Sequence, residues 1–353
     1  PFYAGTYFPK TSRFGHIGLE ELIAGITDIW QNQREKVHES AQQVLEHLQR
    51  NSHGAPDTSP DESTIESAYS QLLSRFDSTY GGFGDSPKFP SPHNLLLLLR
   101  RWHYTGDTGA LHMVEQTLQT MRHGGVYDQI GFGFHRYSTD AQWLLPHFEK
   151  MLYDQALMAL ANIEACQATG KPEYAQTARE VFEYVLRDMT HPDGGFYSAE
   201  DADSEDEEGL FYLWTPEETE QVLGKEKAEL INDILNIRNG GNFMDQASGK
   251  KTSRSIPYFT STAEERARHY NLTPDELESA WQNARQALFK AREQRVHPYK
   301  DDKILTDWNG LMIAALARGA AVLDEPRYAD AAERAAAFIR SNLRSTDGHL
   351  LKR

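Results

Sequence analysis

The sequence has a single cysteine, Cys166, among its 353 residues. One thiol cannot build a disulfide framework, and no Cys-x-x-Cys pair is present for dithiol redox chemistry. Cys166 lies in the apolar helical pattern ALMALANIEACQATG, which favours a small buried side chain over a reactive one. The lack of disulfides favours a reducing compartment, so we expect a cytoplasmic protein.

Long apolar runs and an excess of positive charge are also missing. The longest leucine run, Leu95–Leu99, is far too short to span a bilayer. The 36 Lys and Arg against 52 Asp and Glu give a formal net charge of −16. Such a charge repels nucleic acid and anionic membranes, so we expect neither as a partner.

Motifs for a resident cofactor or metal are absent as well. The sequence has no His-x-x-x-His, no Walker loop and no complete Rossmann fingerprint. The acidic segment Glu200–Glu208 begins with the alternate spacing of an EF-hand loop. Counted from Asp201, the sixth position is Asp206 instead of glycine and the twelfth is Tyr212 instead of glutamate, which excludes that site. We therefore expect no cofactor and no metal.

Length, 39% apolar residues and 25% charged residues are typical of a globular chain of about two domains. Periodic apolar residues predict a helix over 18–50. The following segment NSHGAPDTSPD predicts a linker over 53–60, which separates residues 1–52 from residues 61–353. Beyond it, helices are predicted at 61–79, 92–105, 107–123, 146–169, 172–190, 215–236, 263–294, 305–323 and 326–343.

A short glycine-aromatic phrase returns after several of these helices. It reads GGFG at Gly81, GGVY at Gly124 and GGFY at Gly194, and Asp347-Gly348 begins a fourth copy. Helix pairs joined by such turns are what a toroid of αα-hairpins needs. We expect the turns at Gly124 and Gly194 to open on the same end of that toroid.

Polar and aromatic residues are densest in Gly124–Gln155, which reads GGVYDQIGFGFHRYSTDAQWLLPHFEKMLYDQ. Pro146 suits a first helical position, and a helix from there would place His147, Met151 and Asp154 on one face. A helix N-terminus attracts anions and oxygen-rich ligands. The alternative is a capped, buried helix with a salt-bridged first turn.

The acidic segment that follows lies between GGFYSA and GLFYLW, which alternate like paired strands and predict a hairpin. The run 205–208 is typical of a solvated charge cluster. Glu200, Asp201 and Asp203 come directly after an apolar strand, so we expect them to face inward.

These patterns predict one concave, polar pocket that takes a small, sugar-like molecule. Lys88 and the Trp308-Asn309 pair join it from outside the dense segment, although each also has a structural reading. The catalytic candidates are His135, His147, Glu149, Asp154, Asp201 and Asp203. The substrate-binding candidates are Lys88, Tyr127, Asp128, Arg136, Trp143, Lys150, Tyr153, Glu200, Trp308 and Asn309.

Several motifs together carry a family resemblance. Besides the dense segment, they are GTYFP at 5–9, SPKFP at 86–90, SAEDAD at 198–203 and WNGL at 308–311. In this order they resemble the thioredoxin-domain-containing family related to spermatogenesis-associated protein. One departure is Phe132, where that pattern has a third glycine.

The resemblance implies a thioredoxin-like α/β domain followed by an (α/α)6 toroid, of the six-hairpin glycosidase and N-acylglucosamine 2-epimerase type. We thus expect a mainly α chain that holds an incomplete toroid and, before it, the C-terminal remnant of the thioredoxin-like domain. The family's Cys-x-x-Cys segment would lie upstream.

Three classes of function remain open. A carbohydrate-active enzyme could hydrolyse a glycosidic bond with two carboxyl groups roughly 5–10 Å apart, one from Glu149 or Asp154 and one from Asp201 or Asp203. It could instead epimerise a sugar with the two histidines of the dense segment as acid and base. The second class is a non-catalytic ligand- or client-binding module that serves a thioredoxin-like redox domain. The third is a purely structural toroid, which the density of polar residues disfavours.

Overall fold

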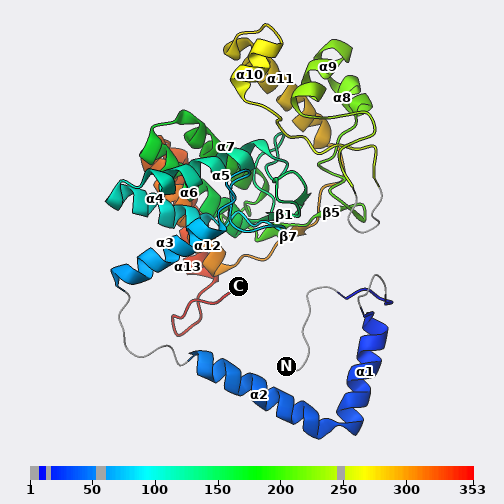
Figure 1. The fold of residues 1–353 in the computed structure, drawn as a ribbon, viewed down its shortest axis with the longest axis vertical. Coiled ribbons are helices and arrows are strands. Elements are labelled where there is room, and N and C mark those ends of the chain that lie inside the picture. The colour runs from blue at the N-terminus through cyan, green and yellow to red at the C-terminus, as the bar shows by residue number, and fades with distance from the viewer. Residues whose placement is uncertain (1–7, 13–16, 53–60, 245–250) are drawn as a thin grey trace. The chain divides into compact units, whose positions relative to one another are not determined.

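A computed structural model of the chain describes residues 8–12, 17–52, 61–244 and 251–353. It divides into two compact units, Pro1–Glu66 and Ser67–Arg353 (Figure 1). The linker predicted at 53–60 lies outside the described residues.

The described part of unit 1 is helical. It contains α1 (Leu19–Asn32), α2 (Arg34–Ser52) and the start of α3 (Glu62–Arg75). The single helix predicted over 18–50 is wrong at Gln33, whose φ of −135° and ψ of 34° leave the helical region. Leu22 and Val37 are buried, whereas Ile23 and Trp30 are exposed.

Helical hairpins form the body of unit 2. Within residues 61–244 and 251–353 three are present: α4 (Pro92–Thr105) with α5 (Thr108–His123), α6 (Leu152–Thr169) with α7 (Pro172–Asp188), and α12 (Thr306–Leu323) with α13 (Pro326–Asn342). Each connection has two residues and begins with a left-handed residue, Gly106, Gly170 or Asp324, which reverses the chain. α6 packs against both α4 and α12. The expected mainly α fold is confirmed, with its hairpins side by side as in an incomplete toroid.

The direction of the helices fixes which loops share an end. The C-terminal parts of α4, α6 and α12 line one cavity, so these three helices run parallel. Their N-termini therefore lie together at the other end of unit 2. Since α5 and α7 run antiparallel to their partners, the turns at Gly124 and Gly194 open at that same end.

Three of the four glycine-aromatic phrases share one local structure. At the copies that begin at Gly81, Gly194 and Asp347, an isolated antiparallel bridge joins the phrase to a residue just after the preceding helix, Phe83 to Phe76, Phe196 to Thr190 and Leu350 to Arg344. At Gly124 the bridge instead runs forward, from Tyr127 to Phe134. Two of the bridged residues, Phe134 and Phe196, are also held by an amide side chain at the fourth position of a later long helix. Gln155 of α6 accepts from the Phe134 N–H and donates to its carbonyl oxygen, and Asn309 of α12 does the same with Phe196.

The helix predicted from residue 146 is wrong in its first six residues. α6 begins only at Leu152, because the preceding residues pair as strands. β2 (Pro146–His147) pairs with β1 (Tyr137–Ser138), and β3 (Lys150–Met151) pairs with β4 (Ala199–Glu200), which also pairs with β7 (Lys300–Asp301). The backbone hydrogen bonds of these residues are thus satisfied across strands.

Two further predicted helices are each divided. Residues 215–236 hold α8 (Pro216–Leu223) and α9 (Lys225–Ile234), separated by Gly224 with φ of 78°. Residues 263–294 hold α10 (Ala263–His269) and α11 (Pro274–Arg292), where a capping box at Thr273 starts a new helix. These four helices have a hydrophobic core of their own and lie apart from the hairpins in Figure 1.

Candidate functional site

The extended segment 146–151 divides the polar residues of this end of unit 2 into two groups. Successive side chains of an extended chain point to opposite sides. His147 and Glu149 accordingly keep about a quarter of their side-chain surface exposed, 25% and 26%. Phe148 and Lys150, which alternate with them, are each 1% exposed. One side of the segment is open to solvent and the other faces the interior.

The open side carries a group of ionisable side chains that we call the rim cluster. Its members are Arg136, His147, Glu149, Tyr153, Asp154 and Glu208. Arg136 Nη1 lies 2.7 Å from Glu149 Oε2, and His147 Nε2 lies 3.1 Å from the same oxygen. The other imidazole nitrogen, Nδ1, lies 2.7 Å from Glu208 Oε1.

These contacts fix the charge of two members. The hydrogen bond from His147, joined by that from Arg136, lowers the pKa of Glu149 to about 2 although burial opposes it. Burial disfavours the charged imidazole, but hydrogen bonds to Glu149 and Glu208 raise the pKa of His147 to about 9. At neutral pH an imidazolium thus lies between two carboxyl groups.

Asp154 has the opposite state. It is 7% exposed, and burial raises its pKa to about 8 despite the attraction of Arg136. Its Oδ2 and the Nε of Arg136 are buried and have no hydrogen-bond partner among the described residues. Buried polar atoms are rarely left unpaired, so these two atoms distinguish this part of the rim cluster.

Aromatic rings flank the rim cluster on two sides. The ring of Tyr153 meets that of Trp308 edge-on at 4.8 Å between centroids. Tyr137 stacks on His147 at 4.9 Å, and Phe89 follows on Tyr137 at 4.8 Å. Both walls offer flat apolar surface beside ionisable groups.

The interior side of the segment carries a second group, the buried ion cluster of Asp128, Lys150 and Arg292. Asp128 receives both Arg292 guanidinium nitrogens at 2.9 Å and Lys150 Nζ at 2.8 Å. None of the three side chains is more than 4% exposed. Arg292 is the last residue of α11, so this cluster ties that helix to the loop that carries Asp128.

His135 belongs to the interior side. Its Nδ1 lies 3.0 Å from the Phe148 carbonyl oxygen, and its ring packs edge-on against Phe148 and Tyr212. Burial lowers the pKa of His135 to about 3, which keeps it neutral. The two histidines proposed as an acid–base pair therefore lie on opposite sides of the segment, and the structure does not bring them together.

Two predicted ligand-binding residues have internal partners instead. The buried Lys88 ammonium donates to Asp77 and to the carbonyl oxygens of Gly81 and Ala141. Trp143 is completely buried. Its indole ring packs against Gly82, and its N–H donates to the Tyr80 carbonyl oxygen. Neither side chain is presented to a ligand.

Three others are occupied in the same way. The Tyr127 hydroxyl donates to Glu180 at 2.6 Å, and Glu200 accepts from the Tyr184 hydroxyl at 2.6 Å. Asn309 is completely buried, and its side-chain amide accepts from the Phe196 N–H and donates to the Phe196 carbonyl oxygen. The expectation that Asn309 reaches sugar hydroxyls is thus corrected, because its amide has no free face.

The acidic hairpin departs from the expectation in a different way. Asp201 and Asp203 were expected to face inward, but both are exposed. β5 (Asp203–Ser204) pairs with β6 (Glu207–Glu208), and burial together with neighbouring carboxylates raises the pKa of Asp203. Glu208, predicted as part of a solvated run, contacts His147. The position of Glu208 could have been predicted from the sequence, because a hairpin with a two-residue turn at 205–206 places Glu208 opposite Asp203.

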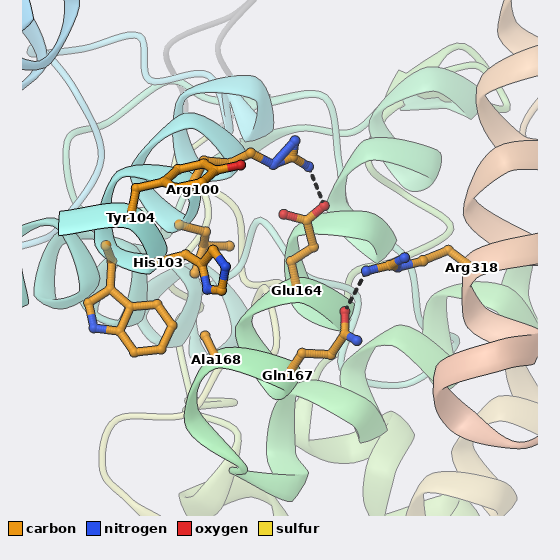
Figure 2. A pocket seen from close by; sticks show the side chains of 9 residues that line it. Arg100, His103, Tyr104, Glu164, Gln167, Ala168 and Arg318 are labelled. Carbon is orange, nitrogen blue, oxygen red and sulfur yellow. Dashed lines mark hydrogen bonds and ion pairs between the residues drawn. The ribbon is translucent and has the colours of Figure 1, made fainter. Parts of the chain in front are cut away.

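A separate cavity of about 420 Å³ lies at the other end of the hairpins, between the C-terminal parts of α4, α6 and α12 (Figure 2). Arg100 reaches Glu164 at 2.6 Å, and Arg318 reaches Gln167 at 3.0 Å. These side chains pair with one another, and none of the residues lining the cavity belongs to the rim cluster.

In the described ranges, no group of three or more His, Cys, Asp and Glu is placed to hold a metal ion. Over those same residues, no helix has both the length and the apolar character needed to cross a bilayer.

Solved structures of sugar-processing enzymes show a loose likeness to this chain. One is a family 76 glycoside hydrolase from a bovine Bacteroides thetaiotaomicron strain, with a TM-score of 0.43 and 12% identity over 76% of this chain and 38% of that one. Another is the cellobiose 2-epimerase of Spirochaeta thermophila, with a TM-score of 0.35 and 16% identity over 82% of this chain and 88% of that one.

Sequence comparisons identify the family. A family model described as a protein of unknown function, DUF255 (Thioredox_DsbH), matches residues 1–49. Spermatogenesis-associated protein 20 of Homo sapiens is 34% identical over 368 residues, which cover 97% of this chain and 47% of the relative. The chain thus spans about half the length of the curated relatives that it matches. The resemblance inferred from the motifs is confirmed, and the chain belongs to the spermatogenesis-associated protein 20 family.

Proposed function

We propose that the rim cluster is the reaction site of a carbohydrate-active enzyme that acts on glycosidic bonds and is linked to a thioredoxin-like domain. One observation carries this proposal. Asp154 holds a proton at neutral pH and has an unpaired oxygen, while Glu149 in the same cluster is ionised. Two carboxyl groups whose pKa values are driven apart by their surroundings are characteristic of acid–base catalysis.

The roles follow from these states. Asp154 is the general acid, which gives its proton to the glycosidic oxygen as the bond from that oxygen to the anomeric carbon breaks. Glu149, with a pKa of about 2, is too weak a base to take a proton at neutral pH. Its permanent charge suits it instead to attack or stabilise the anomeric carbon. Water then adds at that carbon, which releases the Glu149 carboxylate where it has attacked, and the proton lost by the water passes to the Asp154 carboxylate.

Arg136 and His147 position Glu149 rather than react. Both contact the same carboxylate oxygen, so they hold it in one orientation and keep it charged. Epimerisation by two histidines is disfavoured, because His135 faces the interior. The aromatic walls at Trp308 and Tyr137 supply flat surfaces for the less polar faces of a sugar ring.

The test compares the whole chain with Asp154→Asn, Glu149→Gln and the matched control Asp206→Asn, an exposed carboxylate in the adjacent hairpin. Each protein is assayed for hydrolysis of neutral oligosaccharides and, by calorimetry, for binding. We expect Asp154→Asn to lower turnover by about 10²–10⁴-fold while leaving binding in place, because one general acid contributes about that factor. The control should match the unmodified chain. Binding and turnover absent from every protein, the unmodified chain included, would favour the non-catalytic client-binding module.

A further inference from the structure

A row of three adjacent aromatic rings leads from the rim cluster to the protein surface. His147 stacks on Tyr137 at 4.9 Å with 29° between the planes, and Tyr137 is followed by Phe89 at 4.8 Å and 31°. Phe89, the last ring, is 49% exposed. We propose that the outer face of Phe89 is a second ring-binding subsite, so that the ligand of the rim cluster is a neutral oligosaccharide of at least two sugar rings. This inference rests on the proposed function.

Phe89 is fixed in this exposed position. Its neighbour Lys88 forms a backbone bridge with Ser138 of β1, with both hydrogen bonds at 2.8 Å. The Lys88 side chain is anchored in the interior, and Pro90 is buried on the other flank. Because side chains alternate along this extended stretch, Phe89 must point outward. A rigid, exposed aromatic ring binds a ligand at little conformational cost, since its orientation is already set.

The spacing points to a ligand longer than one ring. Two ring steps, of 4.9 and 4.8 Å, separate the outer ring from the imidazole that contacts Glu149. A single sugar held at Glu149 cannot also cover the outer face of Phe89. Sugars further along the same chain would lie against it, and the flat C–H face of a sugar ring matches the aromatic ring.

The charges of the rim cluster favour a neutral ligand. Arg136 is paired with Glu149, His147 is paired with both Glu149 and Glu208, and the remaining acid, Asp154, is protonated at neutral pH. The exposed carboxylates of the β5–β6 hairpin lie close by and repel anions. A sugar phosphate would therefore find no cation here that lacks a carboxylate partner.

The experiment measures binding as a function of chain length. Glucose, mannose and N-acetylglucosamine and their linked di- and trisaccharides are titrated by calorimetry into the full chain, Phe89→Ala and Phe89→Tyr. Tyr104→Ala is the matched control, an exposed aromatic at the other end of the hairpins. Asp154→Asn is assayed for turnover in parallel. Circular dichroism checks that each variant is folded, which the exposure of Phe89 favours.

We expect disaccharides to bind more tightly than monosaccharides. In Phe89→Ala this difference in affinity should shrink by about tenfold. Phe89→Tyr and Tyr104→Ala should keep it. Equal loss for mono- and disaccharides, no gain with length, or no binding of any sugar overturns the subsite. Length-dependent binding through Phe89 without any turnover would instead overturn the proposed hydrolysis, so the two failures are distinguishable.

Discussion

His147 and Glu149 lie on the same side of one extended segment, with Nε2 3.1 Å from Oε2. In a helix, two residues so spaced are rotated by about 200° around the axis and would point to nearly opposite sides. The contact exists only because residues 146–151 pair with β1 and β4 instead of starting α6. The acid–base character of this end of unit 2 is therefore a product of strand pairing, which sets both neighbours of the imidazole.

Removing one of those neighbours should change the titration of His147. Glu208→Gln takes away the carboxylate at Nδ1, so we expect the pKa of His147 to fall from about 9 toward its ordinary value of 6.5. The imidazole resonances followed by NMR against pH measure this shift. Glu207→Gln, an exposed neighbour on the same strand, should leave the titration unchanged.

The same interaction has a defined effect on stability. A histidine whose pKa rises on folding stabilises the protein fully below about pH 6.5, and this contribution is lost as the pH rises through 9. The unmodified chain should thus lose more unfolding free energy than Glu208→Gln between pH 6.5 and 9. Equal losses in the two proteins would mean that Glu208 does not hold the imidazolium.

Asp154 should reduce stability at neutral pH. Its pKa rises on folding from 3.8 to about 8, so the folded state keeps a proton that the unfolded chain releases. The unfolding free energy then falls with rising pH across this window, by at most about 1.4 kcal/mol per pH unit. Asp154→Asn does not titrate, so it should gain stability relative to the unmodified chain from pH 5 to pH 7.5. Urea unfolding at both pH values measures this, and a pH-independent difference would contradict it.

Much of the helical arrangement was predictable because its signals are local. The pattern at 92–105 gives α4 with the observed limits, since Pro92 suits its first position and Gly106 ends it in the left-handed conformation. The Gly-Gly-aromatic phrases likewise predicted repeated turns after helices. Such signals depend on a few adjacent residues and survive whatever the chain packs against.

The site was less predictable because it depends on distant pairing. Pro146 followed by mixed charges is as compatible with an edge strand as with a helix start, and the choice is made by residues 199–200, about fifty positions away. Glu208 looked like part of a solvated run, and only the tight turn before it brings it to His147. Trp143 and Asn309 have structural roles, and these roles can be recognised only once the residues that they contact are known.

The buried ion cluster should be essential for stability. Asp128→Ala leaves Lys150 and Arg292 without their shared carboxylate, and an unpaired buried charge typically costs about 3–5 kcal/mol. Lys303→Ala removes an ion pair with Asp301 that is partly exposed to solvent, so we expect a loss below about 1 kcal/mol. Chemical denaturation of both variants gives the comparison. Similar small losses would show that Asp128 is not what holds the two cations.

The neighbours Trp308 and Asn309 should separate ligand binding from folding. Asn309→Ala leaves the buried N–H and carbonyl oxygen of Phe196 without their amide partner, so we expect a loss of about 1–3 kcal/mol in unfolding free energy and unchanged sugar affinity. Gln155→Ala should behave alike, since it makes the same clamp on Phe134. Trp308→Ala removes a half-buried ring beside Tyr153, and we expect about tenfold weaker binding. If Asn309→Ala weakens binding and keeps its stability, the amide faces the ligand after all, because a clamp cannot be removed without loosening the turn that it holds.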